Sequence, residues 1–563
     1  MSRIHIVNAT YVVTVDDTDR ILTNQTITIE NGIITAIEPA EPHDSTTATA
    51  RPEPAPAPER ESLTRPLAGP GADSAAGKPV GGERGTNRTT EVEQTAQSGS
   101  SLRPLAGSGT DSAAEEPEAA ARSLAGTGGS ARERPRVGAD GLRPRGPSGG
   151  AAEVTTDQAL TDELTIDARG KLLMPGLVNL HTHLPMTLLR GLAENLDLQG
   201  FLEHLWAAEA AVMDEETVQL GATLGALESL LGGCTTQLDM YFHHEATHRG
   251  AVAAGSRHVI GPVFFDGPGP DGLDWPQRLA DLRAWPALLD EIGGPHVPVA
   301  AMPHATYTCS PAGLTEVVMA LREVLTDTPR AGVLTTHVSE TAAENAGIRE
   351  RYDATPTELL ARAGWLEPDL PIVLGHGVHL SDGDRDLLTA AGGAIGHCPG
   401  SNLKLASGAL HWEELRDSGI RIGIGTDGCS SSNDLDMWQA MRQAALLARL
   451  TSERPDVASA TEVLRAATIE GARALGLGDL VGSVEVGKRA DLVLVDLAAP
   501  HLTPVHDVAA LLVFAAGRGD VTDVLVDGRP VVRDRRSTLL DTPGLLARAR
   551  ARGEVARAAA GAR

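Results

Sequence analysis

Aromatic residues and cysteines are both scarce in this chain. Phe, Trp and Tyr make up 3% of its 563 residues, whereas Gly (61) and Pro (35) are plentiful. This skew indicates that part of the chain lies outside any packed core. The four cysteines, Cys234, Cys309, Cys398 and Cys429, include no CxxC pair. So few cysteines in so long a chain exclude a disulfide framework and favour reduced thiols in a cytoplasmic protein.

Net positive charge and long apolar runs are also lacking. The formal net charge is −27, so the surface repels polyanions, and we expect neither nucleic acid nor a membrane as a partner. No stretch reaches the ~18 apolar residues that a membrane-spanning helix needs. Residues 1–8 lack the uninterrupted apolar core of a signal peptide. The sequence therefore predicts a cytoplasmic protein.

A long internal segment differs in composition from the rest of the chain. Residues 44–155 consist largely of Ala, Gly, Pro, Ser, Thr, Arg and Glu, and Arg65–Gly69 is repeated as Arg103–Gly107. These repeats carry too little apolar surface to stack as a solenoid. We expect a disordered insertion here, with a partner-binding role for the repeat as the alternative.

The segments on either side of this insertion predict two kinds of structure. Short β-branched runs separated by turn residues predict strands near both chain ends. Between them, eight apolar strand candidates alternate with amphipathic helices, the pattern of an α/β protein with a (β/α)8 TIM barrel. The expected parts are a small β-sandwich domain from residues 1–43, 156–174 and 481–535, the barrel at 175–480, and a terminal helix or tail at 536–563.

Chemically reactive side chains follow directly after the expected barrel strands. His181 and His183 end one strand and, being two residues apart, point to the same face. Four other apolar runs lead to His304, to His337 with Glu340, to His376 and to Asp427. Such barrels build their active sites at the carboxyl ends of their strands. A lone histidine is usually a core or surface residue, but five such strand ends make coincidence a poor explanation.

These residues predict one divalent metal ion. Three imidazoles and one carboxylate suit Zn²⁺ or Fe²⁺, and the metal would lower the pKa of a bound water from 15.7 to about 7. Glu340 and His376 can then serve as proton shuttle and as hydrogen-bond partner of that water. The candidates for these ligands are the strand-end histidines and Asp427.

The run PGLVNLHTH at Pro175–His183 resembles the opening motif of the amidohydrolase superfamily. Further runs resemble its 5-methylthioadenosine/S-adenosylhomocysteine deaminases, which belong to the s-triazine and purine deaminase group: residues 183–191, 239–243, 401–408 and 425–428 with 433–437. The resemblance covers the chain except for about 43–155. It implies His181, His183, His337 and Asp427 as metal ligands, catalytic roles for Glu340, His376 and Asp427, and substrate contacts from Glu209, His304, Glu340 and Asp427. No lysine lies at a strand end where a bridge to a second ion could form, so one ion is expected. It also implies a homo-oligomer, either a dimer or a tetramer.

The implied activity is hydrolytic removal of an amino group from a nitrogen heterocycle, with release of ammonia. Adenosine-type nucleosides are the expected substrates: 5-methylthioadenosine, S-adenosylhomocysteine, 5′-deoxyadenosine or adenosine. Two departures leave the substrate open. Pro262 stands about where the family usually carries a substrate-binding arginine, and HCPG at His397–Gly400 looks more like guanine deaminases. The alternatives are a deaminase of guanine, pterin or cytosine, an s-triazine-type chloro or amino hydrolase, and a non-catalytic scaffold.

Overall fold

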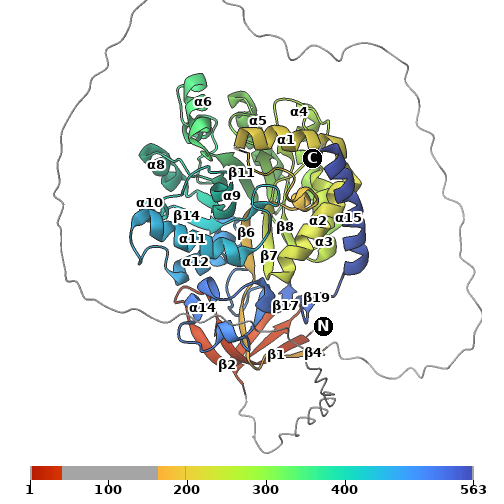
Figure 1. The fold of residues 1–563 in the computed structure, drawn as a ribbon, viewed down its shortest axis with the longest axis vertical. Coiled ribbons are helices and arrows are strands. Elements are labelled where there is room, and N and C mark those ends of the chain that lie inside the picture. Colours follow the sequence, from red (N-terminus) through yellow and green to blue (C-terminus); the bar gives the residue numbers. More distant parts are fainter. Residues whose placement is uncertain (1–2, 41–162, 197, 561–563) are drawn as a thin grey trace, which may run out of the picture. The chain divides into compact units, whose positions relative to one another are not determined.

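The computed structural model describes residues 3–40, 163–196 and 198–560. The expected insertion at 44–155, with its repeats, lies outside the described residues. The strands near the two chain ends form one mixed nine-stranded sheet, shown in red and dark blue in Figure 1. Its order is β19 (Arg536–Ser537), β18 (Arg529–Arg533), β17 (Val521–Val526), β16 (Leu492–Asp496), β5 (Lys171–Pro175), β1 (Arg3–Val13), β2 (Ile21–Glu30) and β3 (Ile33–Pro39), with β4 (Glu163–Asp167) beside β1.

Antiparallel pairing joins the two halves of this sheet. Leu173 of β5 lies opposite Leu494 of β16, so amino-terminal and carboxyl-terminal strands share one hydrogen-bonded ladder. Both side chains are fully buried, and they belong to one apolar cluster with side chains of β1 and β2. The strands from the two chain ends therefore share a core of their own.

The region between the two chain ends contains two parallel sheets. One has the order β14 (Arg421–Ile424), β13 (Ala394–His397), β12 (Ile372–His376), β11 (Gly332–Val338), β10 (Val299–Pro303) and β9 (Val263–Phe264). The other has the order β15 (Asp427–Gly428), β6 (Leu177–His183), β7 (Cys234–Asp239) and β8 (Arg257–Val259).

The chain itself links these two sheets at both of their ends. Only residues 260–262 separate β8 from β9, and only residues 425–426 separate β14 from β15. β14 also lies against β6. The predicted parallel strands are therefore present in sequential order, but the described hydrogen bonds form two arcs rather than one closed ring.

Helices alternate with these strands and surround them in Figure 1. They are α1 (Leu198–Val212), α2 (Glu215–Leu231), α3 (His244–Ala254), α4 (Trp275–Ile292), α5 (Pro311–Thr326), α6 (Ala342–Tyr352), α7 (Pro356–Arg362), α8 (Asp382–Ala391), α9 (Pro399–Lys404), α10 (Trp412–Asp417), α11 (Met437–Ser452), α12 (Ala460–Ala466), α13 (Ile469–Ala474), α14 (Val508–Phe514) and α15 (Thr542–Ala559), with 3-10 turns η1 (Leu184–Leu189), η2 (Pro500–Leu502) and η3 (Arg518–Asp520). Many start at a capping side chain; Ser310, for example, accepts the Gly313 N–H ahead of Pro311. Among the described helices, none is long and apolar enough to cross a membrane.

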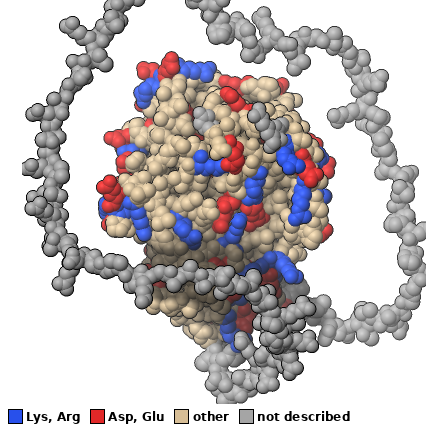
Figure 2. Space-filling model, in the orientation of Figure 1, with Lys and Arg blue, Asp and Glu red and all other residues tan. Residues whose placement is uncertain are grey.

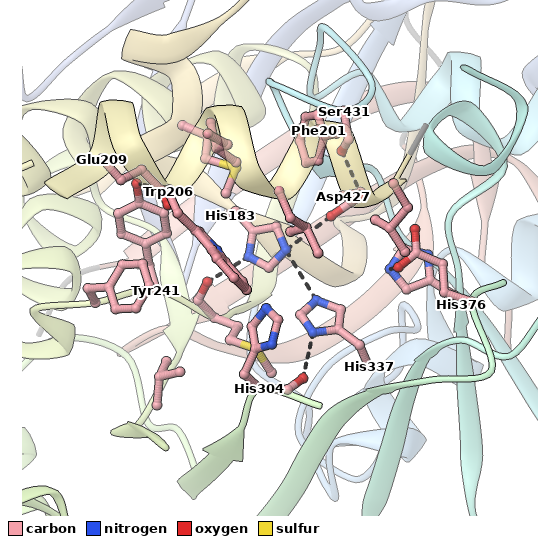
Figure 3. Close-up of a pocket in the computed structure, with 18 of the residues that line it drawn as sticks. His183, Phe201, Trp206, Glu209, Tyr241, His304, His337, His376, Asp427 and Ser431 are labelled. Atoms are coloured by element: carbon pink, nitrogen blue, oxygen red, sulfur yellow. Dashed lines mark hydrogen bonds and ion pairs between the residues drawn. The ribbon is translucent and has the colours of Figure 1, made fainter. Parts of the chain in front are cut away.

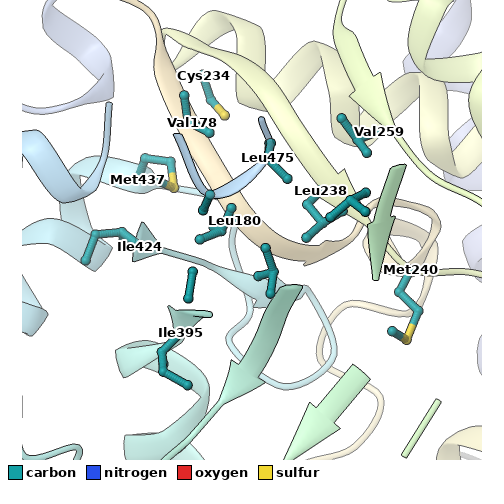
Figure 4. Packing of buried hydrophobic residues seen from close by; sticks show 14 of the residues in the cluster. Val178, Leu180, Cys234, Leu238, Met240, Val259, Ile395, Ile424, Met437 and Leu475 are labelled. Atoms are coloured by element: carbon teal, nitrogen blue, oxygen red, sulfur yellow. The ribbon is translucent and has the colours of Figure 1, made fainter. Parts of the chain in front are cut away.

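Apolar side chains of the parallel strands pack against one another and against residues of the surrounding helices, such as Met437 of α11 (Figure 4). Leu180 of β6 is fully buried, and a Cβ at Gly423 of β14 would lie 2.3 Å from its Cδ2. Glycine at this position lets the two strands approach each other closely. On the face drawn in Figure 2, acidic and basic side chains are interspersed over the described residues.

Candidate metal centre and active site

Five polar side chains from four parallel strands meet in one buried cluster, and Figure 3 labels four of them, His183, His337, His376 and Asp427. His181 and His183 come from β6, His337 from β11, His376 from the end of β12, and Asp427 from the start of β15. All five are at most 8% exposed. The strand-end pattern in the sequence thus corresponds to a real cluster of side chains.

The ligand atoms of this cluster converge on one space. His183 Nε2 lies 3.1 Å from Asp427 Oδ1 and 3.4 Å from His337 Nε2, and His181 Nε2 lies 3.6 Å from the same Asp427 oxygen. His181 Nε2 is buried and has no hydrogen-bond partner among the described residues. Converging imidazole nitrogens beside a carboxylate are a donor set suited to a transition-metal ion. His376 also lies within ligand distance of His181 and His337.

Backbone contacts fix which ring nitrogen faces that space. The Nδ1–H of His183 donates to the Met240 carbonyl at 2.6 Å, and the Nδ1–H of His337 donates to the His304 carbonyl at 2.6 Å. Each bond leaves the Nε2 lone pair free to coordinate, an arrangement common among metal-bound histidines. Burial, together with neighbouring histidines, holds the pKa values of His181 and His337 well below the usual range. Both rings are therefore neutral.

Glycines make room for the His181 ring between three strands. A Cβ at Gly375 would lie 3.0 Å from His181 Cε1, and a Cβ at Gly425 would lie 3.0 Å from its Cβ. At Gly396 an added Cβ would lie 3.3 Å from His181 Cβ. Larger residues at these positions would displace the imidazole, so the local sequence of β12, β13 and the segment after β14 helps to place this ring.

Asp427 is held in position by its backbone and by Ser431. Its φ is +60°, and its strand pairs with Thr182 and His183 at the end of β6. The Ser431 hydroxyl donates to Asp427 Oδ2 at 2.7 Å, which leaves Oδ1 facing the histidines. Burial opposes ionisation of Asp427, but the hydrogen bond and positive charge of His183 outweigh it and hold the pKa of this carboxyl well below its usual value.

Glu340 and His376 form a second acid–base pair beside the cluster. His376 Nε2 lies 3.7 Å from Glu340 Oε2, and its Nδ1–H donates to Asn402 Oδ1 at 3.0 Å. Burial raises the pKa of Glu340. For His376, burial is outweighed by the charges of Glu340 and Asp427, and the pKa is raised. A carboxyl with a raised pKa and an imidazole, both at the mouth of the strands, are suited to moving protons.

The expected substrate contacts line the cavity at the metal centre. Glu209 of α1 accepts the Tyr241 hydroxyl at 2.6 Å, and burial raises the pKa of Glu209 to about 7. His304 follows β10 and stacks on Phe265, with ring centroids 5.0 Å apart. Its Nδ1 lies 3.2 Å from Thr308 Oγ1, and burial lowers its pKa to about 3. Seven of the eight predicted site residues thus line one cavity, and the eighth, His181, belongs to the cluster of histidines with Asp427.

Sequence reasoning did not assign roles to Ser431, Asn402 or Tyr241. Asn402 and Tyr241 lie inside the runs 401–408 and 239–243, so their position in those motifs was an available signal. Ser431 lies four residues after Asp427, and only the turn of the chain in the structure brings its hydroxyl back to the carboxylate. His379, three residues after His376, donates its Nε2–H to the Ser407 carbonyl at 2.6 Å.

Comparisons with known proteins agree with this geometry. The amidohydrolase family model matches residues 172–531. A 5-methylthioadenosine/S-adenosylhomocysteine deaminase of Thermococcus kodakarensis is 41% identical over 368 residues, covering 65% of this chain and 84% of that protein. A 5′-deoxyadenosine deaminase of Methanosarcina mazei is 38% identical over 384 residues, covering 67% and 85%. The crystal structure of a Xanthomonas campestris adenosine deaminase with bound zinc has 30% identity and a TM-score of 0.72, covering 99% of both chains.

Proposed function

The chain belongs to the amidohydrolase family, and from this we propose that it is a metal-dependent hydrolase that deaminates an adenosine-type nucleoside. The observation that carries the proposal is the convergence of His183 Nε2, His337 Nε2 and Asp427 Oδ1 beside the Glu340–His376 pair. Relatives at about 40% identity that are named for 5-methylthioadenosine, S-adenosylhomocysteine and 5′-deoxyadenosine favour a nucleoside over guanine, pterin, cytosine or a triazine.

The proposed metal ligands are His181, His183, His337 and Asp427. The unpartnered, buried Nε2 of His181 and the fixed tautomers of His183 and His337 support this set. A bound Zn²⁺ or Fe²⁺ ion would supply Lewis acidity that makes water nucleophilic at neutral pH. The zinc-bound structure of the Xanthomonas campestris relative favours zinc.

The residues of the chain then divide the proton transfers among them. His376 and Asp427 lie where they can orient the attacking water and accept its proton, and Asn402 holds the His376 ring. Glu340, with its raised pKa, keeps a proton for the ring nitrogen next to the carbon that carries the amino group. After attack on that carbon, Glu340 or Asp427 passes a proton to the departing ammonia.

The remaining cavity wall recognises the nucleoside. The Glu209 carboxyl, fixed by the Tyr241 hydroxyl, can bond sugar hydroxyls through its free oxygen. His304, neutral and stacked on Phe265, offers one ring nitrogen for a hydrogen bond to the substrate. The two parallel sheets are, in this proposal, the arcs of a (β/α)8 barrel at 175–480, with the end strands forming a separate small domain. We also expect assembly into a homo-oligomer, a dimer or tetramer.

An ammonia-release screen tests the function. The full-length protein, loaded with Zn²⁺, is assayed on adenosine, 5′-deoxyadenosine, 5′-methylthioadenosine, S-adenosylhomocysteine, guanine, cytosine, pterins and a chloro- and amino-substituted s-triazine. We expect ammonia and the matching inosine-type product from one or more adenosine nucleosides. Turnover confined to guanine or to pterins would assign a different substrate, and release of chloride or an amine from a triazine without ammonia would contradict deamination.

A further inference from the structure

A second cavity continues the site on the side away from Glu340. It shares the side chains of Trp206, Phe242 and Phe265 with the cavity at the metal centre. Its other lining residues are Ala210, Gly267, Pro268, Gly269, Pro270 and Thr308. In Figure 3 Trp206 lies across His183 from His376, the partner of Glu340. The cavity is called the distal cavity below.

Its wall is aromatic and tightly packed. The ring of Phe265 stacks on Phe242 with centroids 5.6 Å apart and on His304 with centroids 5.0 Å apart. Trp206 meets His304 edge-on at 6.1 Å. The aromatic rings therefore run without a break from the substrate-contacting His304 into the distal cavity.

The orientation of adenine that deamination requires places the sugar near the distal cavity. In adenine, the ring nitrogen N1 adjoins the amino-bearing carbon C6, whereas the sugar is carried by N9 on the opposite edge. If N1 faces Glu340, as in the proposed function on which this inference rests, N9 points away from Glu340. The sugar then lies at Glu209, and whatever replaces the 5′-hydroxyl reaches Trp206 and the distal cavity.

Arg278, which lies behind this wall, is already paired with a carboxylate. Arg278 is 1% exposed and donates to both carboxylate oxygens of Asp271, at 2.9 and 2.6 Å, and to the Val263 carbonyl at 2.8 Å. A Cβ at Gly269 would lie 2.7 Å from Arg278 Nη2, so the loop backbone passes directly over the guanidinium. Among the described residues, no lysine or arginine lines the distal cavity or the cavity at the metal centre.

An uncharged aromatic pocket favours an uncharged occupant. A methylthio group or a 5′-methyl group gains by leaving water for such a wall. The carboxylate and ammonium of a homocysteine group would lose hydration there without gaining a partner of opposite charge. We propose that the distal cavity is the subsite for the 5′ substituent, and that it selects 5′-deoxy- and 5′-alkylthio-adenosines over S-adenosylhomocysteine.

A third cavity is the alternative place for the 5′ substituent of the nucleoside. It meets the site at Tyr307 and Leu405, and its lining includes Glu344 and Arg351, one group of each charge that an amino-acid end needs. It lies on the Glu340 side, since the Glu340 N–H donates to Glu344 Oε2 at 2.8 Å. A nucleoside whose sugar pointed there would bring N9, not N1, toward Glu340.

The wild-type experiment compares kcat/KM for 5′-methylthioadenosine, 5′-deoxyadenosine, adenosine and S-adenosylhomocysteine on the zinc-loaded full chain. We expect kcat/KM for S-adenosylhomocysteine to be at least about 100-fold lower than that for 5′-methylthioadenosine. The reason is that burying an unpaired charge costs several times more free energy than the burial of a methyl group contributes. Values within about threefold of each other would overturn the selectivity. The absence of turnover on all four would instead refute the proposed function.

A matched pair of variants places the subsite. Gly267 has no positive φ, and an added Cβ would meet nothing within 4 Å, so this wall position accepts a long side chain. Gly267→Arg should raise the ratio of kcat/KM for S-adenosylhomocysteine to that for 5′-methylthioadenosine by about tenfold, the effect of one charge-assisted contact. Gly267→Gln, of similar length without charge, should leave the ratio within about twofold. If the two variants give equal ratios, the 5′ group lies elsewhere and the assignment is wrong.

Discussion

The Nε2 atoms of His183 and His337 lie 3.4 Å apart, and each ring donates its Nδ1–H to a backbone carbonyl. Burial opposes protonation of His183, but the Asp427 carboxylate beside its Nε2 outweighs burial and raises the pKa of this imidazole to about 9. Without a metal ion, a proton therefore occupies the space between these side chains. A bound metal ion replaces that proton and is held by several ligands at once, so metal should govern stability as well as activity.

Removal of the metal should abolish activity and lower the melting temperature. A metal that binds only the folded state, at a concentration 100 times its Kd, stabilises that state by about 2.7 kcal/mol. Dialysis against a chelator should therefore lower Tm by several degrees, and Zn²⁺ should restore it.

Asp427→Ala should lose activity by about 10³-fold or more while circular dichroism still shows a folded protein. Wild-type turnover by Asp427→Ala, or by protein shown by elemental analysis to be metal-free, would contradict the site.

Glu340→Gln should separate proton transfer from metal binding. Glu340 contacts His376 but is not among the groups of residues that could hold the ion. We therefore expect unchanged zinc content and a kcat lower by about 10²- to 10⁴-fold, the range for loss of a general acid–base group. Glu350→Gln, an exposed carboxylate on the neighbouring α6, is the matched control and should keep full activity. Loss of zinc from Glu340→Gln would make Glu340 a ligand instead.

The strand-end pattern allowed the cluster of histidines with Asp427 to be predicted. Strand periodicity and barrel topology determine where side chains at the strand ends point. His181, two residues before His183, needed only the alternation of a strand to point the same way. Contacts between segments that are not related by strand periodicity have no such pattern in the sequence. The Ser431–Asp427 bond depends on a turn, and the pairing of β5 with β16 depends on segments more than 300 residues apart in the chain. Local patterns predict strands but not which distant strand will pair with them.

Lys404 should act on catalysis through the loop that carries Ser431. Its ammonium donates to Glu194 Oε1 at 3.0 Å, to the Ser430 carbonyl at 3.1 Å and to Asn433 Oδ1 at 3.0 Å. Lys404→Met frees this loop, so Ser431 no longer holds Asp427 Oδ2 in place. We expect kcat to fall by about tenfold, with a smaller change in KM, the cost of one misplaced hydrogen bond at a reacting group.

A double-mutant cycle distinguishes positioning from general destabilisation. If Lys404 acts through Ser431, the variant that combines Lys404→Met with Ser431→Ala should be no slower than Ser431→Ala alone. Additive losses in kcat would show that Lys404 has an effect independent of the Asp427 hydrogen bond. Melting temperatures of the four proteins, measured with zinc present, report any loss of fold separately.

Deletion of residues 45–154 should leave the enzyme active. β3 ends at Pro39 and β4 begins at Glu163, and both strands belong to the nine-stranded sheet around β1. The entropy of closing a connection grows only slowly with its length, by about 0.6 kcal/mol for each doubling. We expect kcat/KM and Tm close to those of the full chain. A large fall in Tm on deletion would show that the segment packs against the enzyme.

The Glu209 carboxyl should make stability depend on pH between about 4.5 and 7. Burial raises its pKa from the usual value of about 4.5 to about 7, although the Tyr241 hydrogen bond acts in the opposite direction. The folded protein therefore binds this proton more tightly than the unfolded chain does. Its stabilising contribution is complete below pH 4.5 and is lost as the pH rises through 7, a change on the order of 3 kcal/mol in the free energy of unfolding.

Glu209→Gln removes this titration, because the amide stays neutral at every pH. With saturating zinc, the Tm of Glu209→Gln minus that of the wild type should rise from pH 5 to pH 8. The buried carboxyl of Glu344 also has its pKa raised to about 7 by burial, but it titrates in both proteins and cancels in the difference. Tyr241→Phe removes the bond that lowers the Glu209 pKa, so its loss of stability should extend to higher pH than in the wild type. Parallel Tm curves for wild type and Glu209→Gln would mean that Glu209 is already ionised at pH 5, and its bond to Tyr241 would then be that of a carboxylate throughout.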